Sequence, residues 1–272
     1  MSKAFVETTV LADALLKPGP RAKSATSAIR RFDESLLPVY AIKEFKAGPL
    51  HHYVWLHGKL VTTGSWAKTM TQLRKMAAST FKHRWVSTAV EALEAAATKN
   101  SSERLEQLAQ KYGVLASHDA VICDRYRLTL RSIIMRAWRN RRGLTSRIVD
   151  ELECYPEDDV VEERGLIELG ETDCSPTGEC ALAAELKRQP RVLEAMHKAV
   201  QGQPGKPENL KRSQVLHDLI RVPNRELLPK QCRYLGDAIF AFFCPADATI
   251  LTTNERDLRP LAEVLGKSVE TP

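Results

Sequence analysis

The position of the strand-forming segments constrains the fold of this chain most. Residues 248–253, ATILTT, form a β-branched apolar run that is typical of a buried strand. Residues 4–10 and 36–42 are also strand-prone, and each runs into a helical segment, while residues 60–225 have a mostly helical pattern. Chain ends within a domain often lie close together. The sequence therefore predicts an α/β fold with a central sheet built from both chain ends. The expected units are residues 1–60 with 225–272, and a mostly α-helical insertion over 61–224.

Within the insertion, apolar periodicity predicts helices over residues 65–98, 100–111, 117–141, 179–199 and 210–220. Residues 235–243 form an apolar run that fits a helix or a strand. The acidic stretch 153–174 contains proline and glycine and is predicted to be a loop. A helix over 258–265, ended by Gly266, is expected to close the chain.

Composition excludes several classes of protein. The 272-residue chain is 43% hydrophobic, so it can bury a sizeable core. It contains no uncharged apolar run of the roughly 18 residues that would span a bilayer. An acid at position 7 interrupts the N-terminal segment too early for a signal peptide, and six scattered cysteines do not resemble a disulfide scaffold. We therefore expect a cytoplasmic protein with reduced cysteines and no membrane partner.

Charge is distributed unevenly along the insertion. Residues 117–147 contain eight arginines and two aspartates, and residues 150–185 contain thirteen acids and one arginine. Such an asymmetry fits a polyanion-binding face with a counter-charged segment beside it. It fits equally a solvated helix whose arginines pair with the acidic segment. The sequence leaves both interpretations open.

Five acids follow predicted strands or begin helices: Glu7, Glu44, Asp237, Glu255 and Asp257. In open α/β sheets, active sites form outside the carboxyl ends of the strands. Carboxylates gathered there repel one another unless a cation neutralises them. A set of carboxylates without nearby cysteine and histidine suits Mg²⁺ or Mn²⁺, the cations used by metal-dependent nucleases.

Four segments resemble the motifs of PIN-domain ribonucleases, in the order found in that family. The first resembles an opening strand that ends in an acid. The second resembles a glutamate followed by a small residue and glycine, and the third resembles an aspartate at the start of a helix. The fourth resembles a strand followed by an acidic turn. The segments are VETTVLADALL (residues 6–16), PVYAIKEFKAG (38–48), GDAIFA (236–241) and ATILTTNERDL (248–258).

The resemblance implies a PIN-like fold with a central parallel sheet and an acidic pocket that binds Mg²⁺ or Mn²⁺. Glu7, Glu44, Asp237, Glu255 and Asp257 would be the catalytic residues, and all but Glu44 are the expected metal ligands. They would position water against a phosphodiester of RNA, with single-stranded DNA as the alternative substrate. Many members of the family are toxins paired with an antitoxin, and others act in RNA processing or defence. An antitoxin or regulatory protein and a second copy of the chain are therefore the protein partners considered.

In this interpretation the arginine-rich helix binds the RNA backbone, and the acidic segment masks it until a partner displaces it. The arginines expected to contact nucleic acid are Arg125, Arg136, Arg139, Arg141 and Arg142.

Two other interpretations remain. Glu7 and Glu255 stand where the family has aspartate, which favours a non-catalytic nucleic-acid-binding or regulatory protein on a degenerate PIN scaffold. In the third interpretation, the chain is a helical interaction protein whose end motifs are coincidental.

Overall fold

The computed structural model describes residues 1–77, 83–97, 118–149, 152, 160–170, 181–203, 207–222 and 227–272. Its centre is a five-stranded sheet in the order β3-β2-β1-β6-β7, in which every pair of neighbours is parallel. The strands are β1 (Lys3–Val6), β2 (Glu34–Pro38), β3 (Arg147–Val149), β6 (Ala248–Leu251) and β7 (Ser268–Glu270).

The two ends of the chain meet in the middle of this sheet. β1 pairs with β6 along its whole length, so that Val6 lies opposite Leu251, and with β2 on its other side. Phe5, Leu37 and Ile250 are almost completely buried, as expected for a parallel sheet covered by helices on both faces. The register places the residues that follow β1 and β6 side by side.

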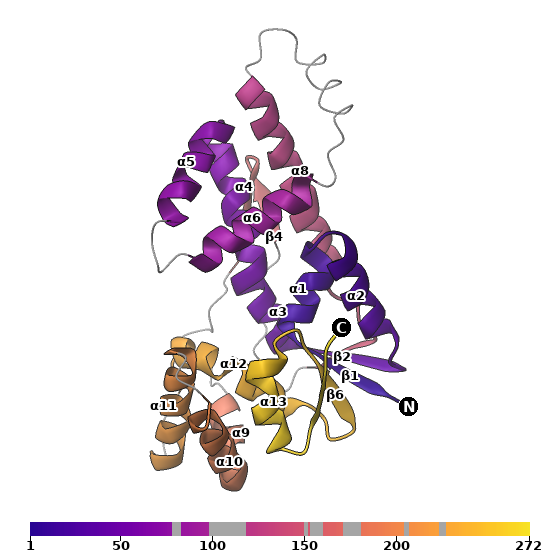
Figure 1. The fold of residues 1–272 in the computed structure, drawn as a ribbon, viewed down its shortest axis with the longest axis vertical. Helices are drawn as coiled ribbons and strands as arrows, with labels where there is room; N and C mark the ends of the chain where they lie inside the picture. The colour runs from indigo at the N-terminus through magenta and orange to yellow at the C-terminus, as the bar shows by residue number, and fades with distance from the viewer. Residues whose placement is uncertain are drawn as a thin grey trace.

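Helices flank the sheet, which confirms the α/β prediction (Figure 1). The Phe240 ring packs edge-on against Phe5, with ring centroids 6.3 Å apart, and against Tyr40, 5.5 Å apart. This contact joins a helix of the C-terminal segment to β1 and to the helix after β2. The flanking helices are α1 (Thr8–Leu16), α2 (Gly19–Arg30), α3 (Val39–Phe45), α12 (Pro229–Phe243) and α13 (Glu255–Glu263).

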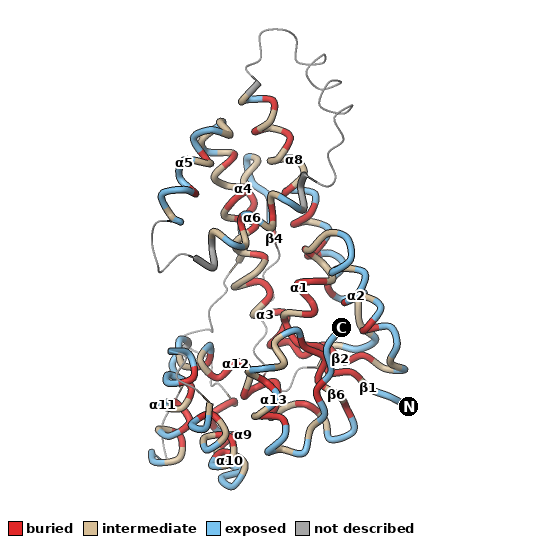
Figure 2. The backbone as a smooth tube through the Cα atoms, viewed as in Figure 1, coloured by how far each residue is buried: buried red, intermediate tan, exposed pale blue. Residues whose placement is uncertain are grey.

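The remaining helices form two groups, one at each end of the view in Figure 1. The upper group contains the antiparallel pair β4 (Val160–Glu163) and β5 (Leu166–Leu169), which contacts α4. The lower group packs beside α12 and α13. The upper group is α4 (His51–Thr63), α5 (Trp66–Ala77), α6 (His83–Ala97) and α8 (His118–Asn140), with η1 (Lys46–Leu50) joining α3 to α4. The lower group is α9 (Ala181–Arg188), α10 (Pro190–Gln201) and α11 (Pro207–Arg221). Buried backbone concentrates in the sheet and on the inner sides of these helices (Figure 2).

The structure corrects the predicted organisation in two places. β3 belongs to the segment that was expected to be a helical insertion, yet it pairs with β2, so the sheet is not built from the chain ends alone. Part of the predicted acidic loop is the β4–β5 pair, which turns at Gly165 with φ +78°, a conformation that favours glycine. An ion pair between Arg131 on α8 and Glu162 on β4, with Nε 2.8 Å from each carboxylate oxygen, holds this pair of strands to α8.

Other segments follow the prediction or lie outside the described part. The apolar run 235–243, whose pattern fits a helix or a strand, is helical and forms part of α12. Gly266 follows α13 with φ +67°, and β7, which was not predicted, comes after it. The helix predicted over 100–111 and half of the acidic stretch, residues 153–159 and 171–174, lie outside the described residues. Among the residues described, no helix is long and apolar enough to cross a membrane.

Candidate functional site: an acidic pocket at the carboxyl edge of the sheet

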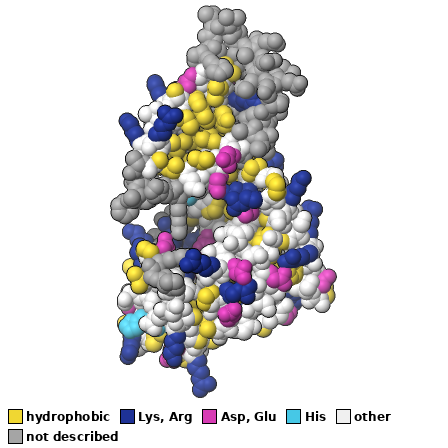
Figure 3. Space-filling view, viewed as in Figure 1, with side chains coloured by type: hydrophobic (Ala, Val, Ile, Leu, Met, Phe, Trp, Pro, Cys, Tyr) yellow, Lys and Arg dark blue, Asp and Glu magenta, His cyan; other side chains and the backbone are white. Residues whose placement is uncertain are grey.

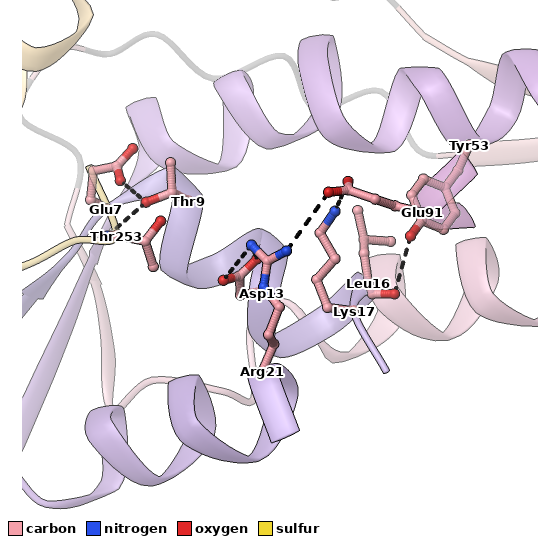
Figure 4. Close-up of polar contacts among 9 residues, drawn as sticks. All are labelled: Glu7, Thr9, Asp13, Leu16, Lys17, Arg21, Tyr53, Glu91 and Thr253. Carbon is pink, nitrogen blue, oxygen red and sulfur yellow. Dashed lines mark hydrogen bonds and ion pairs between the residues drawn. The ribbon is translucent and has the colours of Figure 1, made fainter. Parts of the chain in front are cut away.

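Glu7 is the first residue after β1 and is 95% buried beside the end of β6. Its backbone N–H donates to the Leu251 carbonyl at 3.0 Å, which extends the β1–β6 pairing by one residue. Its Oε2 accepts hydrogen bonds from the hydroxyls of Thr252, at 3.0 Å, and of Thr9. Thr9 in turn accepts from the Thr253 backbone N–H at 3.1 Å (Figure 4). The glutamate carboxylate is therefore held by hydroxyl groups from both chain ends.

Glu44 lies on α3 and is oriented by two hydroxyl groups. Thr8 donates to its Oε2 at 2.8 Å, and Tyr40, one helical turn earlier, donates to its Oε1 at 2.9 Å. The opposite wall is Gly236 on α12, where a Cβ atom would lie only 3.1 Å from Glu44 Oε1. The lack of a side chain at Gly236 therefore lets α12 approach the carboxylate.

Asp237 follows this glycine and is partly buried, with 16% of its side chain exposed. Its Oδ2 forms an ion pair with Nη2 of Arg212, a side chain that comes from α11. Arg212 is 94% buried, and its Nε also donates to the Tyr234 carbonyl at 3.0 Å. A fixed cation therefore lies against one of the predicted metal ligands.

The turn after β6 contributes a fourth acid. Asn254 immediately precedes α13, and its side chain helps to lower the pKa of Asp237 against the larger effect of burial. The negative charge of Asp257 raises the pKa of Asp237, which places this carboxylate near the cluster. Glu255 instead pairs with Arg259 one turn along α13, with its Oε1 2.8 Å from Nε, and is about 39% exposed. Of the two acids predicted in this turn, the structure therefore associates Asp257 with the pocket, whereas Glu255 binds a surface arginine.

The buried acids of the pocket are difficult to ionise. Burial, helped by the negative charges of Glu44 and Asp237, raises the pKa of Glu7 to about 8 against the opposing effect of the Thr9 hydrogen bond. Burial also raises the pKa of Glu44 to about 7, although Thr8 and Tyr40 stabilise its ionised form. The pKa of Asp237 is raised by burial and lowered by Arg212. These directions are those expected of carboxyl groups that share one low-dielectric site.

The donor set fits a hard cation in its chemistry. The acidic pocket, by which we mean the cluster of Glu7, Glu44, Asp237 and Asp257, offers oxygen atoms of carboxylate, hydroxyl and amide groups, the ligands that Mg²⁺ and Mn²⁺ prefer. In the described part of the chain, however, no three acidic, histidine or cysteine side chains converge closely enough to hold one ion together. Because Asp237 is paired with Arg212, a bound cation would require its carboxylate to turn or water to complete the coordination.

The arginines of α8 and the segment after it divide into buried and exposed groups. Arg136, Arg139 and Arg142 are exposed, whereas Arg125 and Arg141 are 96% and 94% buried. The Arg141 guanidinium stacks on the Trp138 ring, 3.4 Å from its centroid, so its position is structural rather than available to a polyanion. On the face drawn in Figure 3, basic side chains lie at separate points among acidic ones, and hydrophobic side chains gather over the upper helices.

A second polar network connects α1 and α2 to the upper helices and lies apart from the carboxylate cluster (Figure 4). Asp13 accepts from Arg21 Nη2 at 3.0 and 3.2 Å, which makes it a structural partner of α2. Glu91 on α6 pairs with Lys17 and lies 3.7 Å from Arg21 Nη1. The network therefore fixes α6 against the first two helices of the sheet domain.

The main site residue that the sequence did not indicate is Arg212, because nothing in its local pattern separates it from the other arginines of the insertion. Tyr40 was also missed, although its position four residues before Glu44 on a helix was a usable signal. Comparison of the chain with protein-family models, curated protein sequences and solved structures found no match.

Proposed function

We propose that the protein is a PIN-like, metal-dependent ribonuclease that hydrolyses RNA phosphodiester bonds at the acidic pocket. One observation carries the proposal: Glu7, Glu44 and Asp237, which are far apart in sequence, interact electrostatically at the carboxyl edge of a parallel sheet. Such an edge is where α/β folds place their reacting groups. The sequence resemblance to PIN-domain ribonucleases implies the same sheet type and an acidic pocket of the same kind.

The raised pKa values of Glu7 and Glu44 support a cation-binding role. Burying several carboxyl groups together costs stability, and a divalent cation would offset that cost. Mg²⁺ or Mn²⁺, when bound, supplies a Lewis acid that activates water and neutralises charge developing on a phosphate.

The chain's own residues would orient the reacting groups. Thr9 and Thr252 fix the Glu7 carboxylate, and Thr8 and Tyr40 fix that of Glu44, so neither has to reorganise when substrate arrives. In this proposal Asp237 and Asp257 complete the oxygen ligands from the opposite side. Glu255 can join Asp237 and Asp257 as an oxygen ligand only if its ion pair with Arg259 breaks.

Single-stranded RNA is the proposed substrate, with single-stranded DNA as the alternative to be tested beside it. Arg136, Arg139 and Arg142 would bind the phosphate backbone by charge. A toxin or defence effector, controlled by an antitoxin or regulatory protein, is the proposed biological setting. That setting rests on the resemblance alone.

The decisive experiment incubates labelled single-stranded RNA and DNA with purified protein in Mg²⁺, Mn²⁺ or EDTA, beside Asp237→Asn. The matched control is Asp247→Asn, which changes a surface aspartate that pairs with Lys3. We expect cleavage that requires the metal, disappears in Asp237→Asn and persists in the control. Equal cleavage by Asp237→Asn and the control, or cleavage in EDTA, would refute the proposal.

A second function is favoured by the Arg212–Asp237 ion pair and by the outward contact of Glu255. In both contacts an arginine of the protein itself neutralises an acid that was expected to bind the metal. This is the arrangement expected of a non-catalytic nucleic-acid-binding or regulatory protein. Binding of intact RNA without cleavage in any metal would support this function over the first.

A further inference from the structure

Arg212 is fixed in the acidic pocket by three separate acceptors. Nε donates to the Tyr234 carbonyl at 3.0 Å, Nη1 donates to Asn209 Oδ1 at 3.2 Å, and Nη2 binds Asp237. Only 8% of the Arg212 side chain is exposed. The cation therefore occupies one defined position rather than moving over the pocket.

One of the acceptors that hold Arg212 is itself held in place by a neighbouring side chain. Asn209 is 95% buried and donates through Nδ2 to Gln203 Oε1 at 2.7 Å, which fixes the orientation of its amide. Two of the three acceptors, the amide of Asn209 and the Tyr234 carbonyl, carry no net charge. A guanidinium stays protonated even when buried, so most of the positive charge of Arg212 remains to act on the acids.

The charge of Arg212 acts on more than its direct partner. The carboxylate of Glu44, on a different helix, also lies beside this part of α12, because its Oε1 would be only 3.1 Å from a Cβ atom at Gly236, the residue before Asp237. A charge close enough to stabilise two carboxylates will also repel a divalent cation bound between them, and water is largely excluded from this site.

We propose that Arg212 is a positioning residue that acts as the built-in cation of the pocket: it directs Asp237 toward α11 and restricts the site to one weakly bound divalent ion per chain. The inference rests on the proposed metal-dependent function. It explains why the acids gather without converging on one point, because one of them is drawn to an internal cation.

The test measures Mn²⁺ binding to the full chain by electron paramagnetic resonance and calorimetry, without substrate. We compare wild type with Arg212→Met, which removes the charge and keeps a long apolar stem, and with Arg212→Lys, which keeps the charge. Arg221→Met, at the exposed end of the same helix, is the matched control. We expect one weakly bound Mn²⁺ in wild type, and in Arg212→Met either at least roughly tenfold tighter binding or a second ion. Arg212→Lys and Arg221→Met should resemble wild type.

Asn209→Asp provides a variant that keeps Arg212 in place if Arg212→Met does not fold. The new carboxylate would pair with Nη1 and neutralise the guanidinium. Gln203 Nε2, which has no hydrogen-bond partner within the described residues, could turn to donate to that carboxylate. This variant should also bind Mn²⁺ more tightly than wild type.

The outcomes separate the two proposals. If wild type binds Mn²⁺ and neither Arg212→Met nor Asn209→Asp changes the affinity or stoichiometry, the role of Arg212 is refuted and the metal site stands. If none of the folded variants binds Mn²⁺, both proposals fail. Binding by Arg212→Met alone would support Arg212 as the internal cation while refuting metal dependence of the wild-type protein.

Discussion

Replacing Glu7 with glutamine should change how the stability of the metal-free protein depends on pH. Glu7 is 95% buried, and its pKa is raised from 4.5 to about 8, chiefly by burial. Between these two values the folded protein keeps a proton on Glu7 that the unfolded chain releases. The free energy of unfolding of wild type should therefore fall as the pH rises through this window.

The size of the effect follows from the shift. A full proton difference changes the free energy of unfolding by about 1.4 kcal/mol per pH unit. Between the unshifted pKa of 4.5 and the folded-state value of about 8, the contribution of Glu7 to the free energy of unfolding amounts to a few kcal/mol. Glutamine keeps the shape and the oxygen that accepts from Thr252, and it never ionises. Glu7→Gln should match wild type near pH 5 and be more stable than wild type near pH 8.

The assay is urea unfolding in EDTA, followed by tryptophan fluorescence, at several values between about pH 5 and 8.5. Glu263→Gln, which changes an acid with a side chain 62% exposed, is the control and should follow wild type. Parallel stability profiles for Glu7→Gln and wild type would refute the buried, proton-binding state of Glu7. Saturating Mn²⁺ should reduce the pH dependence of wild type if the proposed metal site exists.

Three further predictions concern the geometry of the pocket. Thr252→Val removes a fully buried hydroxyl that donates to Glu7 and accepts from the Asn254 N–H. It should therefore lower the free energy of unfolding, measured in urea titrations, by about 1–3 kcal/mol. A change too small to measure would contradict these hydrogen bonds. Gly236→Ala should change stability by less than about 1–2 kcal/mol, because gained helix propensity opposes crowding of the Glu44 carboxylate. The same variant should nevertheless reduce Mn²⁺ affinity severalfold, and unchanged affinity would refute the role of the glycine. In the cleavage assay, Asp257→Asn should be impaired at least tenfold and Glu255→Gln less than threefold; the reverse order would show that Glu255 turns into the pocket.

The sheet and its acidic edge could be predicted because they depend on local signals. The apolar, β-branched run ATIL marks β6, and an acid directly after a parallel strand must lie at the carboxyl edge. This logic placed Glu7 at the edge, and the resemblance to PIN-domain ribonucleases added Asp237, which follows no strand and lies within α12, to the same site. It could not separate Glu255 from Asp257, because both begin the same helix and only the rotation of α13 decides which one lies near the pocket.

Local sequence pattern also could not predict which side chains of the arginine-rich segment are buried. Arg141 and Arg142 are adjacent and chemically identical, yet one stacks on Trp138 and the other is exposed. Both residues lie in the turn after α8, which ends at Asn140, and the packing of the whole domain decides which of the two side chains is covered.

The sequence by itself determined the α/β class, the strands at both chain ends and the acids that follow them, because strand patterning and turn position are local properties. Only the tertiary structure added β3 to the sheet and brought Arg212 against Asp237. Both depend on contacts between segments distant in the chain, and no periodicity or spacing encodes such contacts. The internal cation that distinguishes this pocket is therefore a property of the fold rather than of any motif.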